Sequence, residues 1–476
     1  MYRRNISNIL YPAAGILGLV IVYETWLRPV HILPPPPTQT ESESPANNER
    51  STGPPPEELR DQTPKQNRLI DPSSVPDTKY QEDLGIIRDD IEKGNLKEAE
   101  TRLSRLPPDA ESNPLVRSYL AVLWNNLGIE QEKHEGTQSS VKAFKKAAAL
   151  DGKNPVILMN LAHACWEQRD PAMTTEFLER LIALAPYESF PHLAMAELLQ
   201  ERDRMSEAAR HLDQAAERAG SDPATQSYLR VVTAKVRHTE QTEGRLKSRG
   251  SEHFTVKYDG ETDFDTWTVV QDILEEAYRE IGQKFGHFPS IPIVVVLHAG
   301  ATFQGVTGSP AWADGLFDPV LGRIQVPTQG ALTDRVWLKR VLRHEFVHAL
   351  LHDQQGLNST VLPTWLNEGL AMQLSGDHWS DLEPLARQQM PVIPLSALEG
   401  GWGGLPSETA SVAYLEANSA AQYLIDRYGM YEVQQLLARL KKKQTLTTAM
   451  QSQLSLSYEQ FQSRWLEHMQ GERKMG

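Results

Sequence analysis

Two histidines and one glutamate, His344, Glu345 and His348, form an H-E-x-x-H pattern within an apolar, helix-like stretch. Because an α-helix has about 3.6 residues per turn, side chains four positions apart project from the same face. Two imidazoles placed in this way can occupy two corners of a tetrahedral zinc site. Glu345 would lie beside the metal, where a carboxylate can remove a proton from an activated water molecule. The pattern therefore predicts a hydrolytic zinc centre.

A second pattern, W-L-N-E-G-L-A at 365–371, contains Glu368, which lies twenty residues after His348. A following antiparallel helix could bring this carboxylate back to the two histidines as a third ligand. We therefore predict that His344, His348 and Glu368 bind Zn²⁺. The alternative is a pair of surface histidines on an amphipathic helix. It is disfavoured because the positions around the pair are apolar, and a histidine pair in such a helix needs a partner.

Together the two patterns resemble the gluzincin branch of the zinc metallopeptidases. The second pattern is similar to those of aminopeptidase-like gluzincins and of bacterial peptidase MA-like domains, and the resemblance covers about residues 250–470. It implies an α+β, zincin-like domain in which His344, His348 and Glu368 bind Zn²⁺ and water takes the fourth position. It also implies that Glu345 is the general base of peptide-bond hydrolysis.

A tyrosine is the candidate for stabilising the negative charge that develops on the substrate oxygen. The segment V-A-Y-L-E-A-N-S-A at 412–420 resembles the tyrosine-bearing helix of peptidase MA-like domains, and this resemblance implies a catalytic role for Tyr414. The alternatives are that Tyr414 is a packing residue, or that Tyr423 has the catalytic role.

Several neighbouring positions narrow the class of zinc peptidase. Leu351 and Gln354 stand where the metzincin pattern requires glycine and a third histidine, so that pattern is absent. No G-x-M-E-N motif precedes the metal helix, which disfavours an aminopeptidase. Met372 stands where thermolysin-like enzymes have an aspartate, so the residues that orient the ligands are unassigned. His352 lies one further turn along the helix, about 6 Å away, and is predicted not to be a ligand.

The N-terminal residues 1–33 are predicted to form an uncleaved signal anchor with a single membrane span. Arg3 and Arg4 precede a mostly apolar stretch from Ile9 to Val22, and Trp26 suits the far interface. The alternatives are a cleaved signal peptide and an apolar helix. Residues 34–78 are rich in proline and polar residues and are expected to form a disordered tether. The remaining chain would then lie outside the cytoplasm, in a bacterial periplasm or envelope.

Residues 79–240 have a helical pattern that repeats with a period of 34 residues. At that period three groups of residues superpose: Gly128, Ala162 and Ala196; Phe144, Leu178 and Leu212; Ala147, Leu181 and Ala215. Small residues at the helix crossings let paired helices approach closely. The segment resembles tetratricopeptide repeats, which implies an all-α solenoid that binds a protein partner. The alternative is a helical spacer that binds nothing.

The last domain, 251–470, is expected to mix strands and helices. Alternating or β-branched stretches predict strands at 253–258, 291–298, 313–318 and 322–327. Helices are expected at 267–285, at 334–352 with the metal pattern, at 365–374 and from Ser411 onward. The polar stretch 241–251 is predicted to be a linker.

The composition excludes several classes of function. With a net charge of -14 over 476 residues, the chain has no basic surface to attract nucleic acid. The single cysteine, Cys165, excludes an internal disulfide and a cysteine-cluster metal site. The prediction is a membrane-tethered zinc metallopeptidase that hydrolyses a protein or peptide. The alternatives are a non-catalytic scaffold with an inactive zinc domain, and an aminopeptidase.

Overall fold

The structure is a computed structural model that describes residues 75–475, apart from 77, 135, 169, 221–222, 261–263, 299, 308–314, 328–333, 357–361, 377–391, 401–406 and 443. The predicted anchor (1–33) and most of the predicted tether (34–78) lie outside the described residues. Within the described ranges, no helix combines the length and the apolar character that crossing a membrane requires. The anchor therefore stays a prediction.

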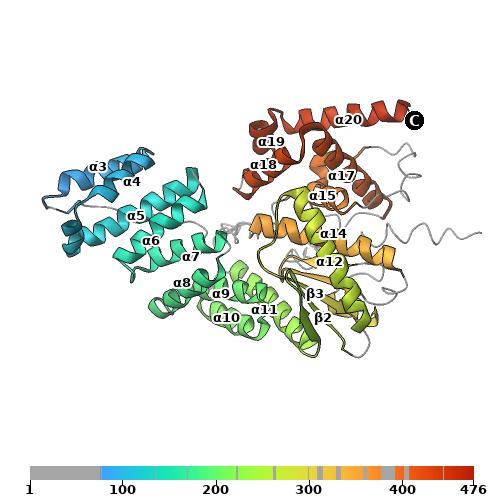
Figure 1. The fold of residues 1–476 in the computed structure, drawn as a ribbon, viewed down its shortest axis with the longest axis horizontal. Coiled ribbons are helices and arrows are strands. Elements are labelled where there is room, and N and C mark those ends of the chain that lie inside the picture. Colours follow the sequence, from blue (N-terminus) through green and yellow to red (C-terminus); the bar gives the residue numbers. More distant parts are fainter. Residues whose placement is uncertain are drawn as a thin grey trace, which may run out of the picture. The chain divides into compact units, whose positions relative to one another are not determined.

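The described residues form two compact units, which we call the N-terminal unit (up to Arg237) and the C-terminal unit (from His238). The N-terminal unit consists of helices in its described part (Figure 1). They are α3 (Gln81–Glu92), α4 (Leu96–Arg105), the 3₁₀-helix η2 (Pro108–Ser112), α5 (Pro114–His134), α6 (Thr137–Leu150), α7 (Pro155–Glu167), α8 (Pro171–Leu184), α9 (Ser189–Glu201), α10 (Met205–Arg218) and α11 (Pro223–Glu243), whose last residues belong to the C-terminal unit.

From α3 to α10, each α-helix packs against the next α-helix along the chain. Local signals define the helix starts: the side chains of Asn154 and Asp170 cap α7 and α8, and each cap is followed by a proline. Gly128 of α5 lies so close to the Phe144 ring of α6 that an added Cβ would be 2.7 Å from Cε1. A small residue thus permits this helix contact, as the sequence pattern suggests. The identification of these helices as tetratricopeptide repeats stays a prediction.

The C-terminal unit contains a mixed sheet with the strand order β1-β2-β3-β5-β4. The strands are β1 (Lys247–Gly250), β2 (Phe254–Tyr258), β3 (Ile293–His298), β4 (Leu316–Asp318) and β5 (Arg323–Pro327). The β2–β3 and β3–β5 pairs are parallel, whereas β1–β2 and β4–β5 are antiparallel. The short strand β4 therefore lies at one edge of the sheet.

Helices cover one face of this sheet (Figure 1). Alternate strand residues, such as Val256 of β2 and Val295 of β3, enter one apolar core with α12 (Phe264–Phe285) and α14 (Arg335–Gln355). The remaining helices of the unit are α13 (Gly300–Thr307), α15 (Thr364–Ser375), the 3₁₀-helix η5 (Leu395–Leu398), α17 (Ser407–Tyr428), α18 (Met430–Lys441), α19 (Leu446–Leu454) and α20 (Tyr458–Met475). The strands and helices expected between 253 and 374 are therefore confirmed within a few residues.

One prediction, the linker at 241–251, is wrong. The helix α11 continues to Glu243, and Lys247–Gly250 forms β1, which pairs with β2 from Lys247↔Tyr258 to Gly250↔Thr255. All four residues of β1 are exposed. Main-chain hydrogen bonds to β2 hold this edge strand, and none of its side chains enters the core. The sequence therefore lacks the alternation of apolar and polar residues from which a strand is predicted.

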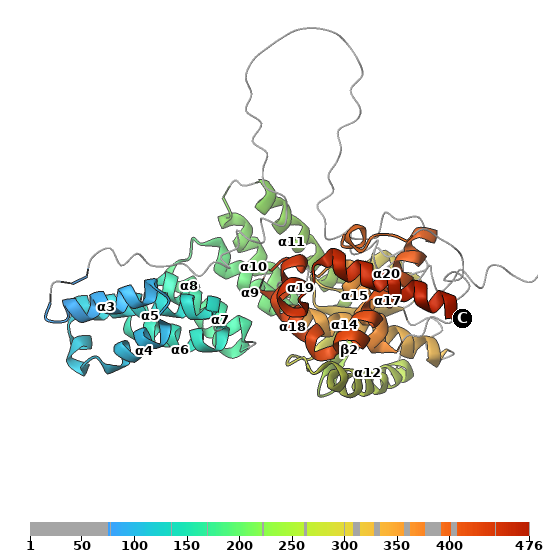
Figure 2. The ribbon, with the colours of Figure 1, turned by 90° about the horizontal axis from the view of Figure 1, so that it is seen from above.

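A close contact joins α15 and α17, the pair that carries two of the predicted site residues (Figure 2). A Cβ added to Gly369 of α15 would clash with the main-chain oxygen of Ala417 and would be 2.7 Å from the Ala421 Cβ. Only glycine permits this approach. The residue after Glu368 therefore fixes the distance between the two helices.

In the N-terminal unit, Glu132 of α5 is a largely buried carboxylate. Its side chain is 17% exposed, and one oxygen lies 3.9 Å from Nδ1 of His163. Burial, assisted by the negative charge of Glu167, raises the pKa of Glu132 from its ordinary value of 4.5 to about 7. The folded chain therefore binds the proton of the Glu132 carboxyl group more tightly than the unfolded chain does.

This shift predicts a pH-dependent stability. The contribution of Glu132 to the free energy of unfolding is most favourable below pH 4.5 and is lost as the pH rises through about 7. We expect Glu132→Gln to stabilise the folded chain at pH 8 by about 2 kcal/mol, with little change at pH 4.5. Urea unfolding at both pH values measures this difference, with the exposed Glu98→Gln of α4 as the control. Equal effects at the two pH values would contradict the prediction.

Candidate metal centre

The helix α14 positions the H-E-x-x-H pattern at the centre of the C-terminal unit. Asp334 begins the helix by accepting a hydrogen bond from the Trp337 N–H at 2.8 Å, and Gly356, with φ of 62°, follows its end. His344, Glu345 and His348 are all buried within it. The apolar positions around them belong to the core, so the helix is held in place by packing on several sides.

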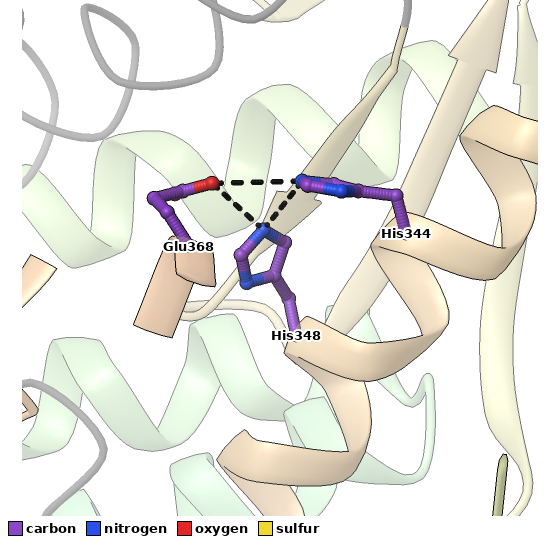
Figure 3. A group of neighbouring side chains, drawn as sticks. All are labelled: His344, His348 and Glu368. Atoms are coloured by element: carbon purple, nitrogen blue, oxygen red, sulfur yellow. Dashed lines mark hydrogen bonds and ion pairs between the residues drawn. The ribbon is translucent and has the colours of Figure 1, made fainter. Parts of the chain in front are cut away.

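Three side chains from two helices meet at one point (Figure 3). The Nε2 atoms of His344 and His348 lie 3.2 Å apart. Each of these atoms lies 3.5 Å from Oε2 of Glu368, which α15 supplies. The structure thus brings together the three residues that the sequence predicts as ligands.

The donor set fits a zinc ion. Ligand atoms about 2.1 Å from a tetrahedral metal are about 3.4 Å from one another, close to the three separations observed. Oε2 of Glu368 is buried and has no hydrogen-bond partner among the described residues. Two imidazole nitrogens and one carboxylate oxygen form a common donor set for catalytic zinc. Within the described part of the chain, no other group of histidine, cysteine and acidic residues meets this geometry.

The candidate ligands His348 and Glu368 shift each other's pKa through their opposite charges. Burial acts to raise the pKa of Glu368, but the charge of His348 and the close approach of both imidazoles, 3.5 Å from Oε2, outweigh it and lower the pKa to about 2. Burial acts to lower the pKa of His348, but the adjacent Glu368 raises it to about 9. The buried carboxylate is therefore held in its ionised form, the form that binds a metal.

Glu345 is buried beside the three ligands but is not one of them. A Cβ added to Gly315, which precedes β4, would be 3.4 Å from Oε1 of Glu345. Burial raises the pKa of Glu345, whereas the charges of His348 and His344 and a hydrogen bond from the Phe317 N–H lower it in part. The net direction is upward, which favours a carboxylate that can both accept and release a proton.

Of the two candidate tyrosines, only Tyr414 is electrostatically coupled to this group. Tyr414 of α17 is completely buried, and burial, followed by the charges of Glu368 and Glu345, raises its pKa well above the ordinary value. Tyr423 instead packs against the ring of Phe461, with ring centroids 5.8 Å apart. The charges of the site thus act on Tyr414, whereas Tyr423 is in contact with Phe461, and the catalytic role of Tyr414 stays a prediction.

Sequence reasoning missed one residue of the site, Asn367. Its Oδ1 lies 3.3 Å from Nδ1 of His348, so it can accept a hydrogen bond from the ring nitrogen that faces away from the ligand group. Such a contact fixes the tautomer that leaves Nε2 free to bind metal. The signal was present, because Asn367 directly precedes Glu368. His352, predicted to be a non-ligand, lies against the Phe317 ring and is outside the ligand group.

The Asn367 contact leads to a prediction about metal affinity. Asn367→Ala removes the acceptor that orients His348, and we expect the zinc affinity to fall about 10- to 100-fold. Competition with a chromophoric chelator measures the affinity. The control is Gln373→Ala. Gln373 lies nearly two turns further along α15, and its side-chain amide donates a hydrogen bond to the side-chain oxygen of Asn418. An unchanged affinity in the Asn367 variant would show that this contact does not orient the ligand.

Comparison with known proteins supports a peptidase-like domain. No curated protein matches the chain. A family model does match: residues 279–471 fit the Peptidase MA superfamily, a range that includes α14, α15, α17 and therefore all three candidate ligands. The C-terminal unit thus contains a domain similar to those of the Peptidase MA superfamily.

Proposed function

We propose that the chain is a zinc-dependent metallopeptidase of the gluzincin type that hydrolyses peptide bonds in proteins or peptides. The observation that supports this most strongly is the meeting of His344, His348 and Glu368 with Glu345 buried beside them. A structural zinc site would have no need of a buried carboxylate next to its ligands. The match to the Peptidase MA superfamily over 279–471 agrees with this assignment.

The ligands and the base have separate roles in the proposed reaction. His344, His348 and Glu368 would hold the ion, which when bound supplies a Lewis acid and lowers the pKa of water. The Glu345 carboxylate accepts a proton from the attacking water molecule. It then donates that proton to the amine that leaves as the peptide bond breaks. A pKa above the ordinary glutamate value serves both steps, because the group must be deprotonated first and protonated afterwards.

Tyr414 has the third role in this proposal. Because its pKa is raised well above the ordinary value, the phenol remains protonated across the physiological range. A protonated phenol can donate a hydrogen bond to the carbonyl oxygen of the substrate as negative charge develops on it. Its complete burial and the charges of Glu368 and Glu345 support this role, because both disfavour the ionised form of the phenol.

The role of Glu345 can be tested by separating metal binding from hydrolysis. Glu345→Gln keeps the three ligands, so we expect full zinc content and a fall in kcat of at least about 10²-fold. His348→Ala is the matched variant, and it is expected to lose zinc on dialysis. Metal analysis and cleavage of a mixed peptide library, with and without chelator, measure both quantities. Full activity of Glu345→Gln would contradict the mechanism, and a wild-type chain without zinc-dependent cleavage would contradict the function.

The role of Tyr414 requires a different comparison. Tyr414→Phe removes only the hydroxyl group, and we expect kcat to fall about 10²-fold with zinc content unchanged. Tyr423→Phe removes the same group from another tyrosine of α17 and is expected to keep the wild-type kcat. Equal rates for the two variants would show that the Tyr414 hydroxyl does not act in the reaction.

A further inference from the structure

The sheet of the C-terminal unit has a buried ionic cluster on the face opposite its apolar core. Arg323 of β5 is completely buried, and its Nη1 donates a hydrogen bond to Oε2 of Glu243, at the end of α11. Lys257 of β2 donates to the same oxygen at 2.9 Å. Glu243 itself is only 4% exposed. A buried guanidinium cannot release its proton, so the position of Arg323 depends on this carboxylate.

Arg323 is connected through the sheet to the strand next to the proposed base. In the antiparallel β4–β5 pair, Asp318 lies opposite Arg323, and Phe317 lies opposite Ile324. β4 has three residues and lies at the edge, so β5 is its strand neighbour within the described sheet. The position of β5 therefore contributes to the position of β4, which also packs against α14.

β4 in turn holds Glu345. The main-chain N–H of Phe317 donates a hydrogen bond to the Glu345 carboxylate. Gly315, just before β4, lies so close to α14 that a Cβ there would be 2.6 Å from Val341 Cγ1. With so little free space, a small displacement of β4 would move or release the carboxylate of Glu345. The contacts thus form one continuous path from α11 through β5 and β4 to α14.

We propose that Glu243 and Arg323 are positioning residues for the general base: their buried ion pair holds β5, and through β4 it holds Glu345 in the orientation that proton transfer needs. This inference rests on the proposed peptidase function. It assigns a role in that reaction to residues on the side of the sheet that faces away from the zinc ligands.

The test compares Glu243→Gln with a matched carboxylate variant, Glu275→Gln. Glu275 of α12 pairs with His253, next to β2, at 2.8 Å. We expect Glu243→Gln to lower kcat about tenfold, because a small misplacement of a catalytic group is costly, while KM and zinc content stay within about twofold. Glu275→Gln should keep the wild-type kcat. A wild-type kcat for Glu243→Gln, or an equal loss in both variants, would overturn the proposal.

A second measurement does not depend on activity. Hydrogen exchange of the segment 315–318, followed by mass spectrometry, should be faster in Glu243→Gln than in Glu275→Gln or the wild type.

Glu243→Asp keeps the buried charge and should fold even where the glutamine variant does not. Because its carboxylate is one methylene shorter, we expect intermediate kcat and exchange rates. Wild-type values of both in folded Glu243→Asp would overturn the proposal. If the wild-type chain cleaves no peptide, the proposed function fails, and unchanged exchange in the Glu243 variants would separately exclude the connection to β4.

Discussion

The C-terminal unit is organised around a group of buried polar side chains that cannot satisfy one another. His344, His348 and Glu368 lie in an apolar core, and Oε2 of Glu368, 3.5 Å from each facing imidazole nitrogen, has no hydrogen-bond partner among the described residues. Removing such groups from water is costly unless a partner compensates. A divalent cation at their meeting point is the partner that the donor atoms and their spacing fit. A bound ion would compensate for the burial of three polar side chains in this core.

The surrounding helices hold this group in place. Gly369 lets α15 approach α17 closely, and α17 carries Tyr414, whose pKa the charge of the candidate ligand Glu368 helps to raise. Asn367, from the same short segment of α15, contacts the ring of His348. One turn of helix thus supplies a candidate ligand, the residue that contacts a second candidate ligand, and the close contact with the helix of Tyr414. A change in any of these residues would affect several functions together.

The two carboxylates of the site differ because their surroundings differ. Glu368 faces two imidazoles, and their positive charge and close approach lower its pKa to about 2 despite burial. Glu345 has one main-chain donor from Phe317, so burial dominates and its pKa is raised. The first environment favours a permanently ionised ligand, and the second favours a group that exchanges a proton. Identical chemical groups therefore obtain separate roles from their neighbours.

The sequence and the tertiary structure determine different features of the C-terminal unit. The spacing of His344 and His348 and the periodicity of the strands and helices are local properties, so the sequence alone predicted the ligand group and most elements around it. The exposed strand β1 could not be predicted, because it is held by main-chain hydrogen bonds that leave no pattern in its side chains. The effect of the Glu368 and Glu345 charges on Tyr414 rather than Tyr423 and the pairing of Glu243 with Arg323 are visible only in the fold. These relations join residues far apart in the chain or on different turns of a helix, and only the packing of the elements determines which of them meet.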